Sequence, residues 1–259
     1  QVAYYVYGYA KLLKKGRLSD GEKLDVTVPT GNFGNILAAY YAKQMGVPIG
    51  KLICASNENK VLYDFFATGT YDRNREFILT SSPSMDILIS SNLERLIYRI
   101  AGESEEETRR LMEELTAGGS YTVTAAMREK ISDFYGGYCT EEETARTIRD
   151  LYKKTGYVLD THTAVAACVC RKYRTETGSD AKNMVVSTAS PFKFTRSVMN
   201  AIDPSHETLA DFEMIDELSR IAGVKIPRAI EEIRSAPVRH TAVAEADKMR
   251  EAVEAFLEI

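Results

Sequence analysis

A buried strand, a glycine-bearing loop and a helix follow one another early in the chain, and this order most restricts the fold. Asp25 to Val28 predicts a short strand, Thr30 to Gly34 a turn, and Ile36 to Ala42 a helix. Glycines let backbone N–H groups converge at the positive end of a helix, which favours binding of a phosphate group. The spacing matches neither a Walker loop nor the dinucleotide pattern GxGxxG.

The same alternation of strands and helices continues along the chain. Leu52 to Ala55 predicts a strand and Val61 to Ala67 a helix, and Met184 to Thr188 returns to strand character. Strands that alternate with helices form parallel sheets, which bind ligands at the carboxyl ends of their strands. We therefore predict an α/β fold with a parallel-sheet core.

The predicted helices divide the chain into three parts. From about Asn92 to Thr155 helical patterns dominate, and they include a helix over Thr124 to Phe134. We predict that residues 1–80 are part of a large α/β domain with the glycine loop and that residues 81–157 are a mainly helical elaboration. Residues 158–259 are predicted to return to the α/β domain and to add C-terminal helices.

The two ends of the chain are also predicted to be helical. Val2 to Ala10 is typical of a packed helix, without a capping residue or start signal before it. We therefore expect the chain to begin in the middle of a fold. Val243 to Leu257 predicts a final amphipathic helix.

Composition excludes several classes of partner. The chain has 259 residues, 44% of them hydrophobic, and a net charge of -4. This charge offers no basic field for nucleic acid or an anionic membrane surface. No run approaches the about 18 apolar residues of a membrane span, and no signal peptide is evident. We expect a cytoplasmic protein that acts on a small molecule.

The four cysteines, Cys54, Cys139, Cys168 and Cys170, are scattered, and we expect reduced, mostly buried thiols. Cys168 and Cys170 lie near His162, but they fall in a predicted helix, where positions two apart point in different directions. We therefore predict no metal site.

Four ordered segments resemble the threonine synthases, which are fold-type II enzymes that use pyridoxal 5'-phosphate (PLP). The resemblance extends from the first helix to about Ala201. The segments are Val28 to Asn35, Ser82 to Asp86 continuing into Ser90 to Arg95, Asp160 to Val165, and Ser187 to Phe194.

The resemblance implies a tryptophan synthase β-like fold and a lyase of threonine biosynthesis that converts O-phospho-L-homoserine and water to L-threonine and phosphate. Backbone N–H groups from Gly31 to Asn35 would hold the PLP phosphate, and the Thr188 hydroxyl would face the pyridine nitrogen. A neutral hydroxyl does not keep that nitrogen protonated, so the ring is a weaker electron sink than with an aspartate partner. The implied cofactor contacts are Gly31, Asn32, Phe33, Gly34, Asn35 and Thr188.

The resemblance also implies a second anion site for the substrate phosphate. Arg95 offers a planar, bidentate grip on phosphate oxygens, with Ser91 and Asn92 as neutral donors. The sequence departs from the family at Thr161, where proline is common, and at Ser190, where histidine is common. The implied substrate contacts are Ser84, Asp86, Ser91, Asn92, Arg95, His162 and Lys193.

Four of these residues also have a structural alternative. Arg95 is then a solvated residue of a helix face, and Thr188 a buried threonine at the end of a strand. His162, in a loop-like stretch before a helix, is then a neighbour of a helix cap, and Lys193 an ordinary exposed lysine.

No segment resembles the family's cofactor-bearing lysine motif, which lies upstream of the glycine loop. We therefore expect a C-terminal fragment without a catalytic residue, inactive alone, whose partner is the missing N-terminal segment of the same protein. Two alternatives stay open. The chain could derive from another fold-type II enzyme, a serine or threonine dehydratase or a cysteine synthase, or from a non-catalytic homologue that binds a phosphate ligand.

Overall fold

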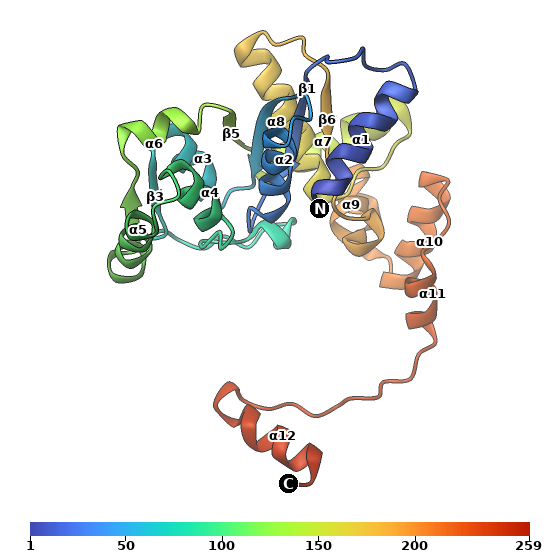
Figure 1. Cartoon of the computed structure of the whole chain (residues 1–259). Coiled ribbons are helices and arrows are strands. Elements are labelled where there is room, and N and C mark those ends of the chain that lie inside the picture. Colours follow the sequence, from blue (N-terminus) through green and yellow to red (C-terminus); the bar gives the residue numbers. More distant parts are fainter. The chain divides into compact units, whose positions relative to one another are not determined.

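A central four-stranded parallel sheet organises the chain (Figure 1). The computed structural model describes residues 1–259, in two compact units, Gln1–Val224 and Lys225–Ile259. Neighbouring strands pair in the order β5-β2-β1-β6, and every pairing is parallel. The strands are β1 (Leu24–Pro29), β2 (Ile49–Ser56), β5 (Phe134–Tyr138) and β6 (Asn183–Val185).

The central strand β1 is buried along its whole length. Val26 pairs with Leu52 of β2 on one side and with Met184 of β6 on the other. Burial of every residue suits a parallel strand, because helices cover both faces of such a sheet. The two polar side chains of the strand are buried with hydrogen-bond partners: Asp25 Oδ1 accepts the Lys51 N–H, and Thr27 Oγ1 donates to Asn183 Oδ1. The α/β fold with a parallel core is thus confirmed.

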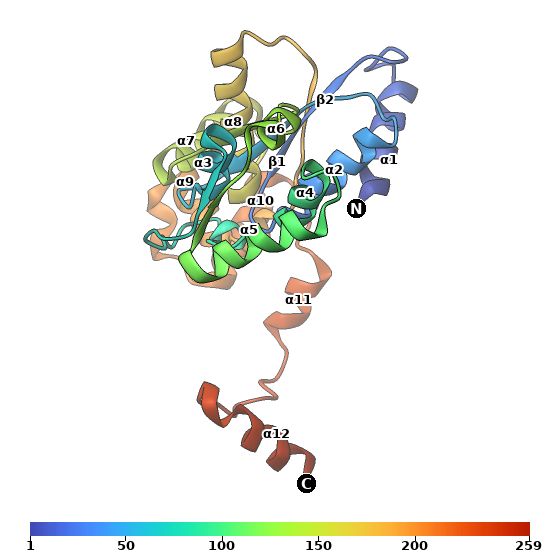
Figure 2. The ribbon, with the colours of Figure 1, turned by 60° about the vertical axis from the view of Figure 1, so that its left-hand side comes forward.

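Helices cover the two faces of the sheet. On one face α8 (Thr161–Thr177) contacts all four strands, with α7 (Glu141–Thr155) packed against it. On the other face lie α2 (Gly34–Gln44) and α3 (Val61–Thr68), and α1 (Val2–Lys14) packs on α2. Figure 2 shows α7 and α8 side by side.

A smaller antiparallel sheet lies beside the core, on the left in Figure 1. It consists of β3 (Thr70–Asp72) and β4 (Ser120–Thr122), where the rings of Tyr71 and Tyr121 stack with centroids 5.4 Å apart. Three helices accompany this sheet, and they are α4 (Leu93–Ile100), α5 (Glu105–Gly118) and α6 (Ala125–Lys130).

The remaining elements are short. The first unit also contains α9 (Thr195–Ile202), α10 (Asp211–Ala222) and the 3-10 turns η1 (Pro83–Met85), η2 (Pro191–Lys193) and η3 (Pro204–Thr208). The second unit contains α11 (Arg228–Arg234), η4 (Ala246–Lys248) and α12 (Met249–Leu257). None of these helices combines the length and the apolar character that crossing a bilayer requires.

Three predicted boundaries are wrong. The helix predicted over Thr124 to Phe134 stops at Lys130, and Phe134 opens β5, an edge strand inside the stretch predicted as mainly helical. Pairing with β2 stabilises this glycine-rich strand, and local propensity does not report such pairing. The strand predicted from Met184 to Thr188 already ends at Val185, and the helix predicted from Val243 begins only at Met249.

Candidate active site

The glycine loop connects β1 to α2 at the carboxyl edge of the sheet. Thr30 directly follows the strand, with its N–H donating to Ala55 O (2.8 Å) and its hydroxyl to Val28 O (2.7 Å). Phe33, the residue before α2, has a left-handed backbone (φ 64°), which is unfavourable for a residue with a side chain. Its ring is only 1% exposed and packs against Phe66 and Phe134, so burial holds this conformation.

The backbone of this loop presents unused hydrogen-bond donors. The N–H groups of Gly31, Asn32, Phe33, Gly34 and Asn35 donate to no acceptor in the chain. The last two belong to the first turn of α2, where the helix carries partial positive charge. Successive free N–H groups around a left-handed residue form a concave anion site. The loop therefore fits a phosphate group through its backbone, and the buried Phe33 ring takes no part.

The segment after β3 packs closely against the glycine loop and makes hydrogen bonds to it. A Cβ atom on Gly31 would lie 2.7 Å from Ser84 O and 2.9 Å from the Ile87 side chain, so only glycine fits there. Ser90 Oγ donates to Gly31 O (2.6 Å). Asn92 Nδ2 donates to Asn32 O (2.7 Å), so this amide supports the loop.

A cavity of about 450 Å³ brings two predicted cofactor contacts together. Asn35 lines it from α2 and Thr188 from the segment after β6, with Met184 and Val186 as apolar walls. No charged side chain lines this cavity. Thr188 is exposed and follows the strand, so the alternative of a buried threonine at a strand end is wrong.

Asp86 is engaged entirely within the protein. Its Oδ1 accepts hydrogen bonds from Asn57 Nδ2 (2.7 Å), Asn59 Nδ2 (3.0 Å) and Thr80 Oγ1 (2.7 Å). Its Oδ2 accepts the Thr80 N–H (2.9 Å). The carboxylate therefore ties η1 to the end of β2. Sequence reasoning missed Asn57 and Asn59, although two asparagines directly after a buried strand were a usable signal.

His162 lies in the first turn of α8 and not in a loop as predicted. Its Nε2 accepts the Ser84 N–H (3.2 Å), so the ring proton lies on Nδ1, which is 3.6 Å from Asp160 Oδ1. Burial raises the pKa of Asp160, but hydrogen bonds from His162 and Thr163 outweigh it and hold that pKa below its usual value. His162 thus connects the cap of α8 to η1, and Ser84 itself is exposed.

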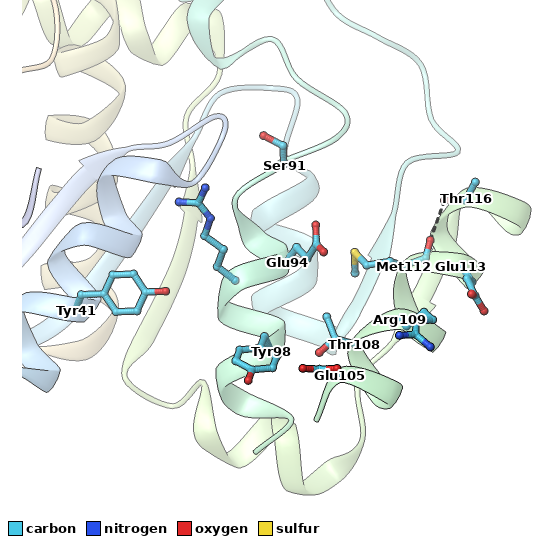
Figure 3. Close-up of a pocket in the computed structure, with 11 residues that line it drawn as sticks. Tyr41, Ser91, Glu94, Tyr98, Glu105, Thr108, Arg109, Met112, Glu113 and Thr116 are labelled. Carbon is cyan, nitrogen blue, oxygen red and sulfur yellow. Dashed lines mark hydrogen bonds between the residues drawn. The ribbon is translucent and has the colours of Figure 1, made fainter. Parts of the chain in front are cut away.

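Ser91 and Arg95 line a separate cavity of about 810 Å³ between α4 and α5. The Arg95 guanidinium is exposed and makes no hydrogen bond or ion pair within the chain, so it is free for an anion. Asn92 is not among the lining residues. Figure 3 shows Ser91 and Glu94 on one wall, with Tyr41 across the cavity and Arg109 and Glu113 on α5.

The large cavity contains residues that the sequence analysis missed. Arg109 adds a second guanidinium without an ion pair, and Glu94, Glu105 and Glu113 add carboxylates. These charges suit a ligand with both anionic and cationic groups better than a bare phosphate.

Lys193 lines neither of these cavities. It belongs to one of about 270 Å³ beside α9 and α10, where its Nζ lies 5.4 Å from the centroid of the Phe194 ring. The structure thus joins Asn35 with Thr188, Ser91 with Arg95, and Ser84 with His162. Lys193 lines neither the Asn35 cavity nor the Arg95 cavity, but the Phe194 ring beside it packs on the His162 ring, with centroids 4.7 Å apart.

Comparison with known proteins shows which proteins this chain resembles. Residues 163–257 match a family model described as "Threonine synthase, C-terminal". Threonine synthase of Saccharomyces cerevisiae is 36% identical over 241 residues, which is 87% of this chain and 46% of the relative. The chain is a relative of the threonine synthases. Threonine synthase-like 1 of Homo sapiens is 44% identical over 204 residues, which is 78% of the chain and 27% of that protein.

Solved threonine synthases share the fold of this relative. The yeast threonine synthase structure superimposes with a TM-score of 0.83 at 32% identity, over 99% of this chain and 51% of the other. The PLP-bound threonine synthase from Brucella melitensis gives a TM-score of 0.73 at 36% identity, over 86% and 45%. The fold is thus the fold-type II architecture. This threonine synthase relative spans about half the length, or less, of the proteins it matches.

Proposed function

We propose that the protein of which this chain is part converts O-phospho-L-homoserine and water to L-threonine and phosphate, with PLP as cofactor. One observation carries the proposal, namely the five free N–H groups from Gly31 to Asn35, beside the cavity that Asn35 and Thr188 share. PLP, when bound, supplies an electron sink for the substrate's reacting carbons.

The chain's own groups divide the binding work. The loop N–H groups and the first turn of α2 would bind the cofactor phosphate without a cationic side chain, since none lines that cavity. Met184 and Val186 would flank the apolar ring, and the Thr188 hydroxyl would hydrogen-bond the ring nitrogen without fixing a proton there.

Arg95 and Ser91 would bind the substrate phosphate. Arginine grips two phosphate oxygens at once and stays charged, so it favours departure of the phosphate as an anion. We also propose that the lysine that holds PLP and moves protons belongs to the additional length of the relatives, because no motif in this chain matches it. The chain by itself is then inactive.

The test is to supply O-phosphohomoserine and PLP to the full-length protein and to this chain, and to follow threonine and inorganic phosphate together. We expect equal release of both products from the full-length protein and of neither from the chain. Threonine formation by this chain alone would refute the proposal that the PLP-binding lysine lies outside it.

The same assay separates the alternatives. A dehydratase or a cysteine synthase shares the glycine loop but needs no second phosphate site. This class is favoured if the full-length protein forms no threonine from O-phosphohomoserine and turns over serine or threonine instead. A protein that binds PLP or phosphate and turns over none of these substrates favours the binding homologue.

A further inference from the structure

Two cysteines far apart in the sequence meet in the core with a glutamate. Cys139 follows β5, Glu143 lies in the first turn of α7, and Cys168 lies in the middle of α8. Both cysteines are fully buried and free of disulfides, and Glu143 is only partly buried. One sulfur from each cysteine and one carboxylate oxygen all lie within 4.8 Å of one another.

We propose that Cys139, Glu143 and Cys168 form a binding site for a thiophilic divalent cation such as Zn²⁺. Zinc binds thiolate sulfur at about 2.3 Å and carboxylate oxygen at about 2.0–2.2 Å, so atoms that share one ion lie at most about 4.6 Å apart. The three ligand atoms, now within 4.8 Å of one another, come within this limit after a small change in the side-chain torsions. Two thiolates select zinc over magnesium and calcium, which prefer oxygen ligands.

The surroundings of Glu143 complete the site. Its Oε2 accepts hydrogen bonds from Lys172 Nζ (2.7 Å) and from the Thr140 N–H (2.9 Å), which orient the carboxylate. Two thiolates and one carboxylate carry three negative charges, and Lys172 carries one positive charge. A divalent ion therefore makes the buried cluster neutral. The side chain of Glu143 is 28% exposed, so the carboxylate end of the site reaches solvent.

The sulfur of Cys139 has a polar neighbour besides Glu143 and Cys168. It lies 3.3 Å from the Thr144 hydroxyl of α7. An ion would replace the thiol protons and connect β5, α7 and α8 through its bonds. The sequence-based expectation of no metal site considered only Cys168, Cys170 and His162, whereas the structure pairs Cys168 with Cys139.

The test is a titration of the full chain, reduced with a phosphine and free of PLP, with Zn²⁺ by calorimetry and with Cd²⁺ by near-ultraviolet absorption. Cadmium bound to thiolates gives a charge-transfer band. We expect one ion per chain and a higher unfolding temperature with zinc. Cys139→Ser and Cys168→Ser are expected to weaken binding by more than about 100-fold, and Lys172→Met by about 10-fold.

Cys54→Ser and Cys170→Ser are matched controls, because both residues are buried cysteines outside the cluster. We expect the zinc affinity of these two variants to stay within a factor of about 3 of the wild-type affinity. The absence of a charge-transfer band, or equal affinity in the cluster and control variants, overturns the proposal. If the cluster variants do not fold, NMR of cadmium bound to the wild type decides, since its chemical shift reports whether two sulfurs are ligands. A shift typical of oxygen and nitrogen ligands also overturns it.

Discussion

Replacing Gly31 by alanine tests whether the close approach of η1 shapes the glycine loop. The added Cβ would lie 2.7 Å from Ser84 O, 2.9 Å from Ile87 Cδ1 and 3.2 Å from Met85 Cα. Two of these three atoms belong to the backbone, so rotation of one side chain does not relieve the contact. Gly31 has no positive φ, so the effect is steric and not conformational.

The expected cost lies in the upper half of the range for overpacking. Overpacked sites lose about 1–3 kcal/mol. Asp86 holds η1 from one side through Asn57, Asn59 and Thr80, and His162 Nε2 holds it from the other. Since η1 has little freedom to move, we expect a loss of about 2–3 kcal/mol, which is a factor of about 30–150 in the folded-to-unfolded ratio.

The assay is urea unfolding followed by tyrosine fluorescence. The chain has no tryptophan, and all 15 tyrosines precede residue 225, so this signal reports only the unit Gln1–Val224. With a urea slope of about 2–3 kcal/mol/M, the expected loss lowers the midpoint by about 1 M.

Gly118→Ala is the matched control for this variant. Gly118 is a helical residue without positive φ, and its added Cβ would meet nothing within 4 Å. The control is expected to be neutral or more stable by about 0.5–1 kcal/mol. If Gly31→Ala is as stable as Gly118→Ala, the packing argument for the loop is refuted.

Three further predictions follow from the same contacts. Asp86→Ala removes the acceptor of four hydrogen bonds and is expected to lower the free energy of unfolding by about 2–4 kcal/mol in urea titrations. A loss below about 1 kcal/mol contradicts the role of Asp86. Asp160 has a lowered pKa when folded, so its contribution to stability is complete above its unfolded pKa of about 3.9 and is lost as the pH falls through the folded value. The stability gap between wild type and Asp160→Asn is therefore expected to shrink on acidification below about pH 4, and a gap that is independent of pH counts against this cause. In the full-length protein, Arg95→Gln is expected to lower kcat/KM for O-phosphohomoserine by about 10–100-fold. Arg99→Gln, which replaces another arginine of α4 and removes its ion pair with Glu103, is expected to leave kcat/KM nearly unchanged, and equal effects of the two substitutions refute the phosphate role.

The sequence by itself determined the parallel α/β core and the position of the glycine loop. Both follow from local patterns, because the strand residues of β1, the glycines and the helical residues of α2 are adjacent in the chain. Free N–H groups at the start of α2 are a direct result of that local order.

Only the tertiary structure decided which distant residues act together. Asp86 was predicted to contact substrate, but it binds Asn57 and Asn59, which precede it by more than 25 residues. Arg95 meets Arg109 of α5 in one cavity, and Cys168 meets Cys139. Such neighbours depend on how helices cross and strands pair, and β5 itself exists only through its pairing with β2, so local propensity carries no signal for them.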